Sequence, residues 1–204
     1  MTKLYLVRHG ETAWNTEKRT QGSMNIALSE KGRLQAEVLA HRLKNFHIDR
    51  IYSSDLDRAY QTGCIIGNII GQEVEKINEL QEMSFGQWEG LTAEEIKKDF
   101  HEEFVVWRNK PHEANIPGGE ALLQVQKRGL DAVYKLVKLN PNKNIMIVSH
   151  GIMIKAIILG MLDIDFCYFY KIRQDNTALN IIDFLNQEPV LVTLNDISHL
   201  ENIE

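Results

Sequence analysis

The chain has 204 residues, of which 44% are hydrophobic and four are proline, so it is long enough to bury a full core. Its formal net charge is −5, and no Lys/Arg-rich run supplies the broad basic surface that attracts nucleic acid or an anionic membrane. We therefore expect one globular domain over residues 1–204, without nucleic acid or a membrane as partner. An anionic ligand must then be held by a few local cations.

The apolar runs and the cysteines indicate the cellular compartment. The run Leu4–Val7 is too short for a signal peptide, and Lys155 interrupts the longer run Ile152–Leu162. Cys64 and Cys167 lie in apolar surroundings, with neither the spacing of a zinc site nor the density of a disulfide scaffold. We therefore predict a cytoplasmic protein with two buried thiols.

Strands and helices are expected to alternate from the N-terminus onward. Leu4–Val7 is a continuous apolar run, which is typical of a central strand covered on both faces. The segment that follows Ser29 is expected to form a helix with Ser29 as its cap. Its apolar positions have helical spacing at Leu34, Val38, Leu39 and Leu43.

The middle of the chain continues this alternation. A strand is expected at Ile51 and Tyr52, followed by a helix that Ser54 or Asp55 can cap. The apolar residues of that helix are Ile65, Ile66, Ile69 and Ile70. Thr92–Glu95 has the form of a capping box and predicts the start of a further helix.

The second half of the chain is expected to end in two strands. A long periodic segment, 118–137, predicts a helix that leads into an apolar strand at Ile145–Val148, and Ile152–Leu162 predicts the next helix. TALNIIDF and VLVTL read as strands joined by a turn through Asn186–Pro189. The alternation predicts an α/β fold, a three-layer sandwich with a mostly parallel central sheet and helices on both faces.

Two of the expected strands run into the same dipeptide, His-Gly. His9 and Gly10 follow the first strand, and His150 and Gly151 follow the strand at Ile145–Val148. Ligands of open α/β sheets bind beyond the carboxyl ends of the strands, so we expect the two histidines to meet in one cleft. The glycines let the backbone turn sharply and approach a ligand closely.

Two arginines are expected at the same cleft. Arg8 precedes His9, and Arg58 lies in the first turn of a helix, close to free backbone amides. Guanidinium groups match phosphate oxygens and stay charged, so they can neutralise a transferring phosphoryl group without a metal. No third ligand accompanies His9 and His150 at the usual metal-site spacings. The residues predict a phosphate pocket, and we expect neither a metal ion nor a cofactor.

Six motifs resemble, in order, those of the histidine phosphatase superfamily, the phosphoglycerate mutase-like proteins. They are RHGETAWN at Arg8–Asn15, QGSMNIALSEKGRLQA from Gln21, SSDLDRAYQT from Ser53, QEMSFGQWEG from Gln81, PGGE from Pro117 and SHG from Ser149. The resemblance covers nearly the whole chain, and it departs from the family pattern at 25–27 and at Ala121. It implies phosphoryl transfer by histidine.

The resemblance also implies a role for each matching residue. His9 matches the nucleophile that becomes phosphohistidine, and Glu82 matches the general acid that protonates the leaving oxygen and then activates water. His150, Arg8 and Arg58 match the groups that bind the phosphoryl oxygens and stabilise their charge. Supporting contacts to phosphate or substrate match Asn15, Gln21, Gly22 and Gly151.

Several residues have a competing interpretation. Glu79 is an alternative to Glu82 as the acid, and Arg8 and Arg58 are alternatively plain ion-pair partners. The aromatic residues after the acid are expected in the core more than in a substrate pocket or lid. They are Phe85, Trp88, Phe104 and Trp107.

The predicted reaction is hydrolysis of a phosphomonoester of a small phosphorylated metabolite. Mutases of the superfamily commonly carry an insertion between the acid and the PGGE-like motif, whereas this chain has 34 residues between Glu82 and Pro117. FGQWEG resembles the phosphatase members, so a histidine acid phosphatase-like enzyme is expected. Mutase-type phosphoryl transfer is the alternative, and a non-catalytic phospho-ligand binding module is a remote one. The oligomeric state stays open, with a homodimer as one option.

Overall fold

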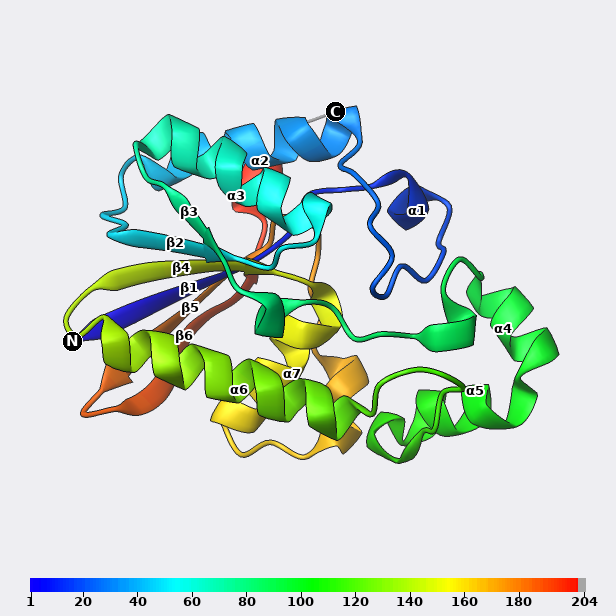
Figure 1. Cartoon of the computed structure of the whole chain (residues 1–204). Coiled ribbons are helices and arrows are strands. Elements are labelled where there is room, and N and C mark those ends of the chain that lie inside the picture. Colours follow the sequence, from blue (N-terminus) through cyan, green and yellow to red (C-terminus); the bar gives the residue numbers. More distant parts are fainter. Residues whose placement is uncertain (202–204) are drawn as a thin grey trace.

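The computed structural model describes residues 1–201, in which a six-stranded sheet lies between two layers of helices (Figure 1). The strands are β1 (Thr2–Arg8), β2 (Arg50–Ser53), β3 (Val74–Lys76), β4 (Asn144–Ser149), β5 (Leu179–Leu185) and β6 (Glu188–Asp196). The helices are α1 (Ala13–Thr16), α2 (Glu30–Leu43), α3 (Asp57–Ile70), α4 (Ala93–Asp99), α5 (His101–Asn109), α6 (Leu122–Leu139) and α7 (Gly151–Met161).

The sheet is mostly parallel, with strand order β3-β2-β4-β1-β5-β6. β3, β2, β4 and β1 pair in parallel, whereas β5 and β6 are antiparallel to their neighbours. α2 and α3 cover one face, and α6 and α7 cover the other (Figure 1). The predicted three-layer α/β architecture is confirmed.

Alternation along the central strands builds a core on each face of the sheet. Leu4 and Leu6 of β1 pack into the cluster beneath α6 and α7, whereas Tyr5 and Val7 pack into the cluster beneath α2 and α3. β4 alternates in the same way over the buried run 145–148. Both strands are buried on both faces, which explains their continuous apolar sequences.

Two predicted caps are confirmed and a third is wrong. Ser29 caps α2 by accepting from Gly32 N (3.0 Å), and Thr92 forms a capping box at the start of α4. The α3 N-cap, however, is Leu56 and has no side-chain hydrogen bond. Ser54 does not cap α3, because its hydroxyl accepts from Leu56 N (3.3 Å), ahead of the helix, and lies 2.8 Å from Nε2 of His150. Asp55 does not cap it either, and its Oδ1 accepts from Gln81 Nε2 (2.7 Å).

Two other local predictions also need correction. Leu34 of α2 is 44% exposed, because the buried face of the helix passes through Gln35 and Ala36 instead. Cys167 is exposed and Cys64 partly exposed, so the thiols are not both buried. Cys167 lies in a short 3₁₀ helix, η4 (Phe166–Lys171). The side chain of Asp165 caps this helix by accepting from Cys167 N (2.7 Å).

The most apolar helix, α7, starts directly after His150. Most of its side chains are buried because it packs against both α6 and the sheet. Within residues 1–201, no helix has the length and apolar character required to cross a membrane.

The C-terminal segment after β6 is tied to α2 and to the loop that precedes β5. Asp196 forms an ion pair with Arg42, which also donates to Ser198 Oγ (2.8 Å). Nε2 of His199 lies 3.0 Å from Thr177 Oγ1, and the Thr177 hydroxyl donates its own proton to the Asn176 carbonyl. The His199 ring is therefore assigned as the neutral Nε2–H tautomer.

We expect His199 to make stability depend on pH. Burial, and then the charge of Arg42, lower the pKa of His199 to about 4, below the value of about 6.5 in an unfolded chain. The unfolded state therefore binds more protons between these values, so this stabilisation is complete above about pH 6.5 and is lost as the pH falls toward 4. Melting temperatures should fall less on acidification in His199→Gln than in the unchanged protein. His41→Gln, on the exposed face of α2, is the control, and equal pH dependence in all three would contradict the assignment.

Candidate active site

The two His-Gly dipeptides lie side by side at the carboxyl edge of the sheet. β1 and β4 pair in register with Arg8 opposite Ser149, so the residues that follow are adjacent. The imidazole centroids of His9 and His150 are 5.2 Å apart, at an interplanar angle of 56°. The structure thus brings the two histidines together, beyond the ends of two central strands.

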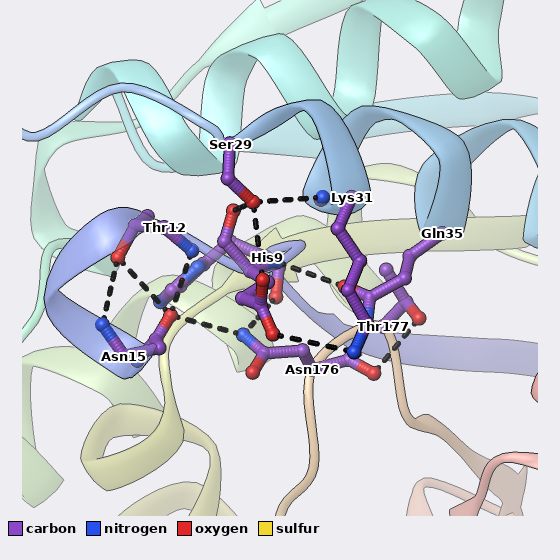
Figure 2. A network of polar contacts seen from close by, with 10 residues as sticks. His9, Thr12, Asn15, Ser29, Lys31, Gln35, Asn176 and Thr177 are labelled. Atoms are coloured by element: carbon purple, nitrogen blue, oxygen red, sulfur yellow. Dashed lines mark hydrogen bonds and ion pairs between the residues drawn. The ribbon is translucent and has the colours of Figure 1, made fainter. Parts of the chain in front are cut away.

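The backbone of His9 is fixed from both sides. Its N–H donates to Ser149 O (2.9 Å), and its carbonyl accepts from Asn176 Nδ2 (3.0 Å) and from Thr177 N (3.3 Å; Figure 2). Nδ1 of His9 lies 2.7 Å from Gly10 O. A carbonyl only accepts, so this contact assigns the ring proton to Nδ1 and leaves the lone pair on Nε2.

The surroundings of His9 favour its neutral form. Burial is the largest cause that lowers its pKa well below the usual value, and the charges of Arg58 and Arg8 act in the same direction. A neutral imidazole with its lone pair on Nε2 is the form that can act as a nucleophile.

A capping box places Asn15 beside His9. Thr12 caps α1, and Asn15 Oδ1 accepts from Thr12 N (3.0 Å) and from Asn176 Nδ2 (3.3 Å; Figure 2). With its amide oxygen occupied in this way, Asn15 presents its Nδ2 group as a donor. Asn176, as far as which the family resemblance extends, links Asn15 and His9 and so positions both.

Arg58 is completely buried and is held by backbone carbonyls. Its Nη1 donates to Met24 O and its Nη2 donates to Gly22 O, both at 2.7 Å. Gly22 has φ +53°, and a β-carbon there would collide with the Glu89 carboxylate. Gly22 therefore orients Arg58 with its carbonyl, which requires a conformation and a close approach that favour glycine. Gln21, just before it, is buried as well.

Arg8 is held in a similar way near the start of α7. Its Nη1 donates to Gln174 O (2.6 Å). Gly151, the first residue of α7, lies against it, and a β-carbon on Gly151 would be 3.4 Å from Arg8 Nε. Arg8 and Arg58 are thus oriented by neutral backbone carbonyls, and no carboxylate of residues 1–201 forms an ion pair with either guanidinium group.

His150 is oriented by Ser54. Ser54 Oγ accepts from Leu56 N (3.3 Å) and lies 2.8 Å from Nε2 of His150. If the hydroxyl proton is assigned to this contact, the ring proton of His150 lies on Nδ1. Burial is again the first cause that lowers the pKa of His150 well below its usual value, followed by the charge of Arg58.

Several buried polar atoms of these residues lack a partner within residues 1–201. They are Arg8 Nε, Arg58 Nε, Gln21 Oε1 and His150 Nδ1. Buried polar atoms without a partner are rare in folded proteins, so their concentration beside His9 indicates a ligand site. The two arginine Nε atoms are donors, as is His150 Nδ1 in the tautomer assigned above, so the ligand they fit is an anion.

The Glu82 carboxylate lies at the N-terminus of α7, where it meets the backbone of the residues that follow His150 and Gly151. It accepts from Met83 N (3.0 Å), Ile152 N (3.2 Å) and Met153 N (3.1 Å). Glu79, the competing acid, instead lines a separate cavity with Asp131 and Lys135. Only Glu82 of these two acids adjoins the histidines.

Arg128 of α6 anchors the segment that carries Glu82. Its Nη1 donates to Glu79 O and Gln81 O (both 2.7 Å), its Nη2 donates to Glu82 O (3.1 Å), and it pairs with Glu120 (2.7 Å). Sequence reasoning missed Arg128, although Glu120 of the PGGE motif is its partner.

Arg128→Met is expected to displace Glu82, the predicted acid, while leaving the rest of the site in place. It removes the donors to three backbone carbonyls, so kcat/KM for alkyl phosphates should fall about 10-fold, a loss of about 1.4 kcal/mol. Steady-state kinetics should show a smaller loss with p-nitrophenyl phosphate, whose leaving group needs little protonation. Lys127→Met, the exposed neighbour, is the control. Equal losses with both substrates would contradict a positioning role.

Comparison with known proteins gives a consistent family. The sequence matches the model of the histidine phosphatase superfamily (branch 1) over residues 4–197. Phosphoserine phosphatase 1 of Hydrogenobacter thermophilus is 35% identical over 98% of this chain and 95% of its own length. A protein named probable phosphoglycerate mutase GpmB, from Escherichia fergusonii, is 31% identical over 98% of this chain and 96% of its own.

Solved structures have the same fold. Bacillus stearothermophilus YhfR superposes with a TM-score of 0.94 at 32% identity, covering 98% of this chain and 100% of its own. A mutant phosphoserine phosphatase of Entamoeba histolytica, in complex with phosphoserine, superposes with a TM-score of 0.89 at 36% identity over the same shares. The chain therefore belongs to the histidine phosphatase superfamily, branch 1.

Proposed function

We propose that this protein is a metal-independent phosphomonoesterase that hydrolyses a small phosphorylated metabolite through a phosphohistidine on His9. The observation that supports it most is the set of buried, unpartnered donors of Arg8, Arg58 and His150 beside a neutral imidazole. Fixed donors around a phosphoryl group stabilise the charge that develops during its transfer.

In the first step, Nε2 of His9 attacks phosphorus while the ester P–O bond breaks. The leaving oxygen takes a proton from the Glu82 carboxyl group, and the product alcohol departs. In the second step, the Glu82 carboxylate takes a proton from water, and the resulting oxygen attacks the phosphohistidine. Inorganic phosphate leaves, and both His9 and Glu82 return to their initial forms.

Donors from several elements are proposed to bind the phosphoryl oxygens during both steps. Arg8 and Arg58 supply charge, while His150 Nδ1 and the free Nδ2 of Asn15 supply further hydrogen bonds. The supporting substrate contacts proposed are those of Gln21, Gly22 and the Gly151 backbone. Because guanidinium groups perform the charge neutralisation, turnover is expected to survive EDTA, as a metal-chelation assay would show.

The family relationships support hydrolysis of a small metabolite and keep one alternative. Two relatives are phosphatases by name, and an Entamoeba histolytica phosphoserine phosphatase is also known in complex with 3-phosphoglyceric acid. Mutase-type transfer is the second candidate, because GpmB proteins are similar over nearly the whole chain. We further propose that residues 1–204 form one domain and that the protein is cytoplasmic, where its free thiols would stay reduced.

The test is phosphate release from a panel of phosphorylated metabolites. In parallel, 3-phosphoglycerate is incubated with and without 2,3-bisphosphoglycerate, and 2-phosphoglycerate is followed. Free phosphate without isomerisation is the expected result. Rapid isomerisation with little free phosphate would identify a mutase instead, and inactivity in both assays would contradict both reactions.

A further inference from the structure

A cavity of about 250 Å³ lies near the proposed phosphate site, although its lining includes neither histidine of that site. Ile152 connects the two, because it lines the cavity and donates its N–H to Glu82 (3.2 Å). The cavity is walled largely by aromatic rings, and its charged lining residues are Lys18, Arg19, Arg108 and Lys155. Among the described residues, no Asp or Glu lines it, so the cavity is cationic.

Lys155 is the cation nearest to the catalytic groups along α7. It lies one helical turn beyond Ile152, and helical side chains tilt toward the helix N-terminus, which here is the phosphate site. Its ammonium group lies 4.9 Å from the ring centroid of Phe169, and no carboxylate of residues 1–201 lies within ion-pair distance. Burial, and then the charge of Arg8, lower the pKa of Lys155, and the charge of Glu82 opposes them only in part. A nearby anion would offset both effects.

Arg108 of α5 is held in the same manner. Its guanidinium carbon lies 4.5 Å from the ring centroid of Tyr170, the residue after Phe169. The Tyr170 hydroxyl donates to Trp107 O (3.0 Å), and the rings of Phe169 and Tyr170 meet edge to face at 5.3 Å. An aromatic face orients a cation without the neutralisation that a carboxylate brings, so the positive charges of Lys155 and Arg108 remain available.

Arg19, by contrast, is already occupied. It pairs with Glu17 (3.0 Å) and Glu95 (3.3 Å), and it also donates to Gly90 O (2.7 Å). The charge of Arg19 is therefore neutralised by carboxylates of this chain, unlike the charges of Lys155 and Arg108.

We propose that Lys155 and Arg108 form an anion subsite that binds a second anionic group of the substrate while its phosphoryl group lies beside His9. The inference rests on the proposed function and narrows it to small esters that carry a carboxylate or a second phosphate. Both kinds of anion accept charge-assisted hydrogen bonds from ammonium and guanidinium groups. The volume of the cavity suits a short ligand rather than a large one.

Two matched ligand pairs test the subsite. 3-Phosphoglycerate and glycerol 3-phosphate differ by a carboxylate in place of a hydroxymethyl group, and fructose 1,6-bisphosphate and fructose 6-phosphate differ by one phosphate. The His9→Ala variant, which prevents turnover, is titrated calorimetrically with each ligand. In one pair, the member that carries the second anionic group should bind at least about 10-fold more tightly than the member that lacks it. The pair that responds identifies the second anion as a carboxylate or a phosphate.

Variants of Lys155 assign that preference to the subsite. Lys155→Met keeps an apolar stem over Phe169, and it should reduce the preference to within about 2-fold, whereas Lys155→Arg should restore it. Lys138→Met, which removes an exposed charge on α6, should leave the preference unchanged. In proteins that retain His9, the same Lys155→Met change should raise KM for the preferred ester by a larger factor than KM for the matched ester that lacks the second anionic group.

The outcomes separate the subsite from the proposed function. Equal binding within both pairs, or a preference that survives Lys155→Met combined with Arg108→Met, would overturn the subsite even if phosphatase activity is found. If no ester is hydrolysed, the phosphatase proposal fails, while a preference lost in Lys155→Met would still support the subsite.

Discussion

His9→Ala is expected to lower kcat for phosphate release by about 10⁵-fold or more, since loss of a nucleophile removes the covalent route entirely. The fold should persist, because the contacts that fix this residue to Asn176 and Ser149 are made by its backbone. Removing the imidazole removes one hydrogen bond, with Gly10 O, and the packing against His150. Steady-state phosphate release, with circular dichroism as a check of folding, measures both expectations.

The control for this prediction is a histidine away from the cleft. His41→Ala on the exposed face of α2 should retain full activity. Activity of His9→Ala within about 10-fold of the unchanged protein would remove His9 as the nucleophile, because binding effects alone are of that size.

Glu82→Gln is expected to lower kcat/KM for alkyl phosphates by about 10³-fold, within the range for loss of a general acid. Glutamine keeps the size of the side chain but has no acidic proton for the leaving oxygen. With p-nitrophenyl phosphate, kcat/KM should fall by about 10-fold or less, because nitrophenolate leaves without protonation. The ratio kcat/KM is the correct quantity, since kcat also includes the proposed hydrolysis of phosphohistidine, for which Glu82 is the proposed base.

Glu79→Gln, three residues earlier, is the matched control for this change. Its carboxylate faces the separate cavity near Asp131, so both substrates should be turned over normally. Equal losses of kcat/KM with both substrates in Glu82→Gln would assign Glu82 a role other than proton donation.

Local patterns predicted the elements whose environment is uniform. The runs Leu4–Val7 of β1 and Ile145–Val148 of β4 are apolar because both faces of these strands are covered. The parallel register of the two strands places their His-Gly dipeptides side by side. The periodicity that indicated α2 placed Leu39 and Leu43 correctly on its buried face but placed Leu34 there wrongly. Small residues, Ala36 and Ala40, complete that face instead. The packing of α2 against its neighbours decided that face.

Contacts between distant segments were outside the reach of the sequence. Arg128 anchors carbonyls 46 to 49 residues away, and Asn176 reaches His9 over 167 residues, so no spacing rule indicates either of them. Ser54 has the sequence position of a helix cap, but its hydroxyl forms a hydrogen bond with the distant residue His150 instead.

The aromatic residues after Glu82 combine two roles, core packing and cavity lining, that the sequence analysis treated as alternatives. Phe85, Trp88 and Trp107 are buried in the core, as predicted, whereas Phe104 is only partly buried against it. All four also line the cationic cavity. A ring can pack with one side and face a cavity with its edge, so apolar spacing alone does not separate the two roles.

The central claim is that the phosphoryl group passes through His9. Rapid quenching of the enzyme with ³²P-labelled substrate in alkali, followed by tryptic digestion, tests it directly. We predict label on the peptide of residues 9–18, with the acid lability and alkali stability of phosphohistidine, and loss of that label in His9→Ala. Label on the peptide of residues 144–155, which carries His150, or phosphate release without a labelled enzyme would contradict the account.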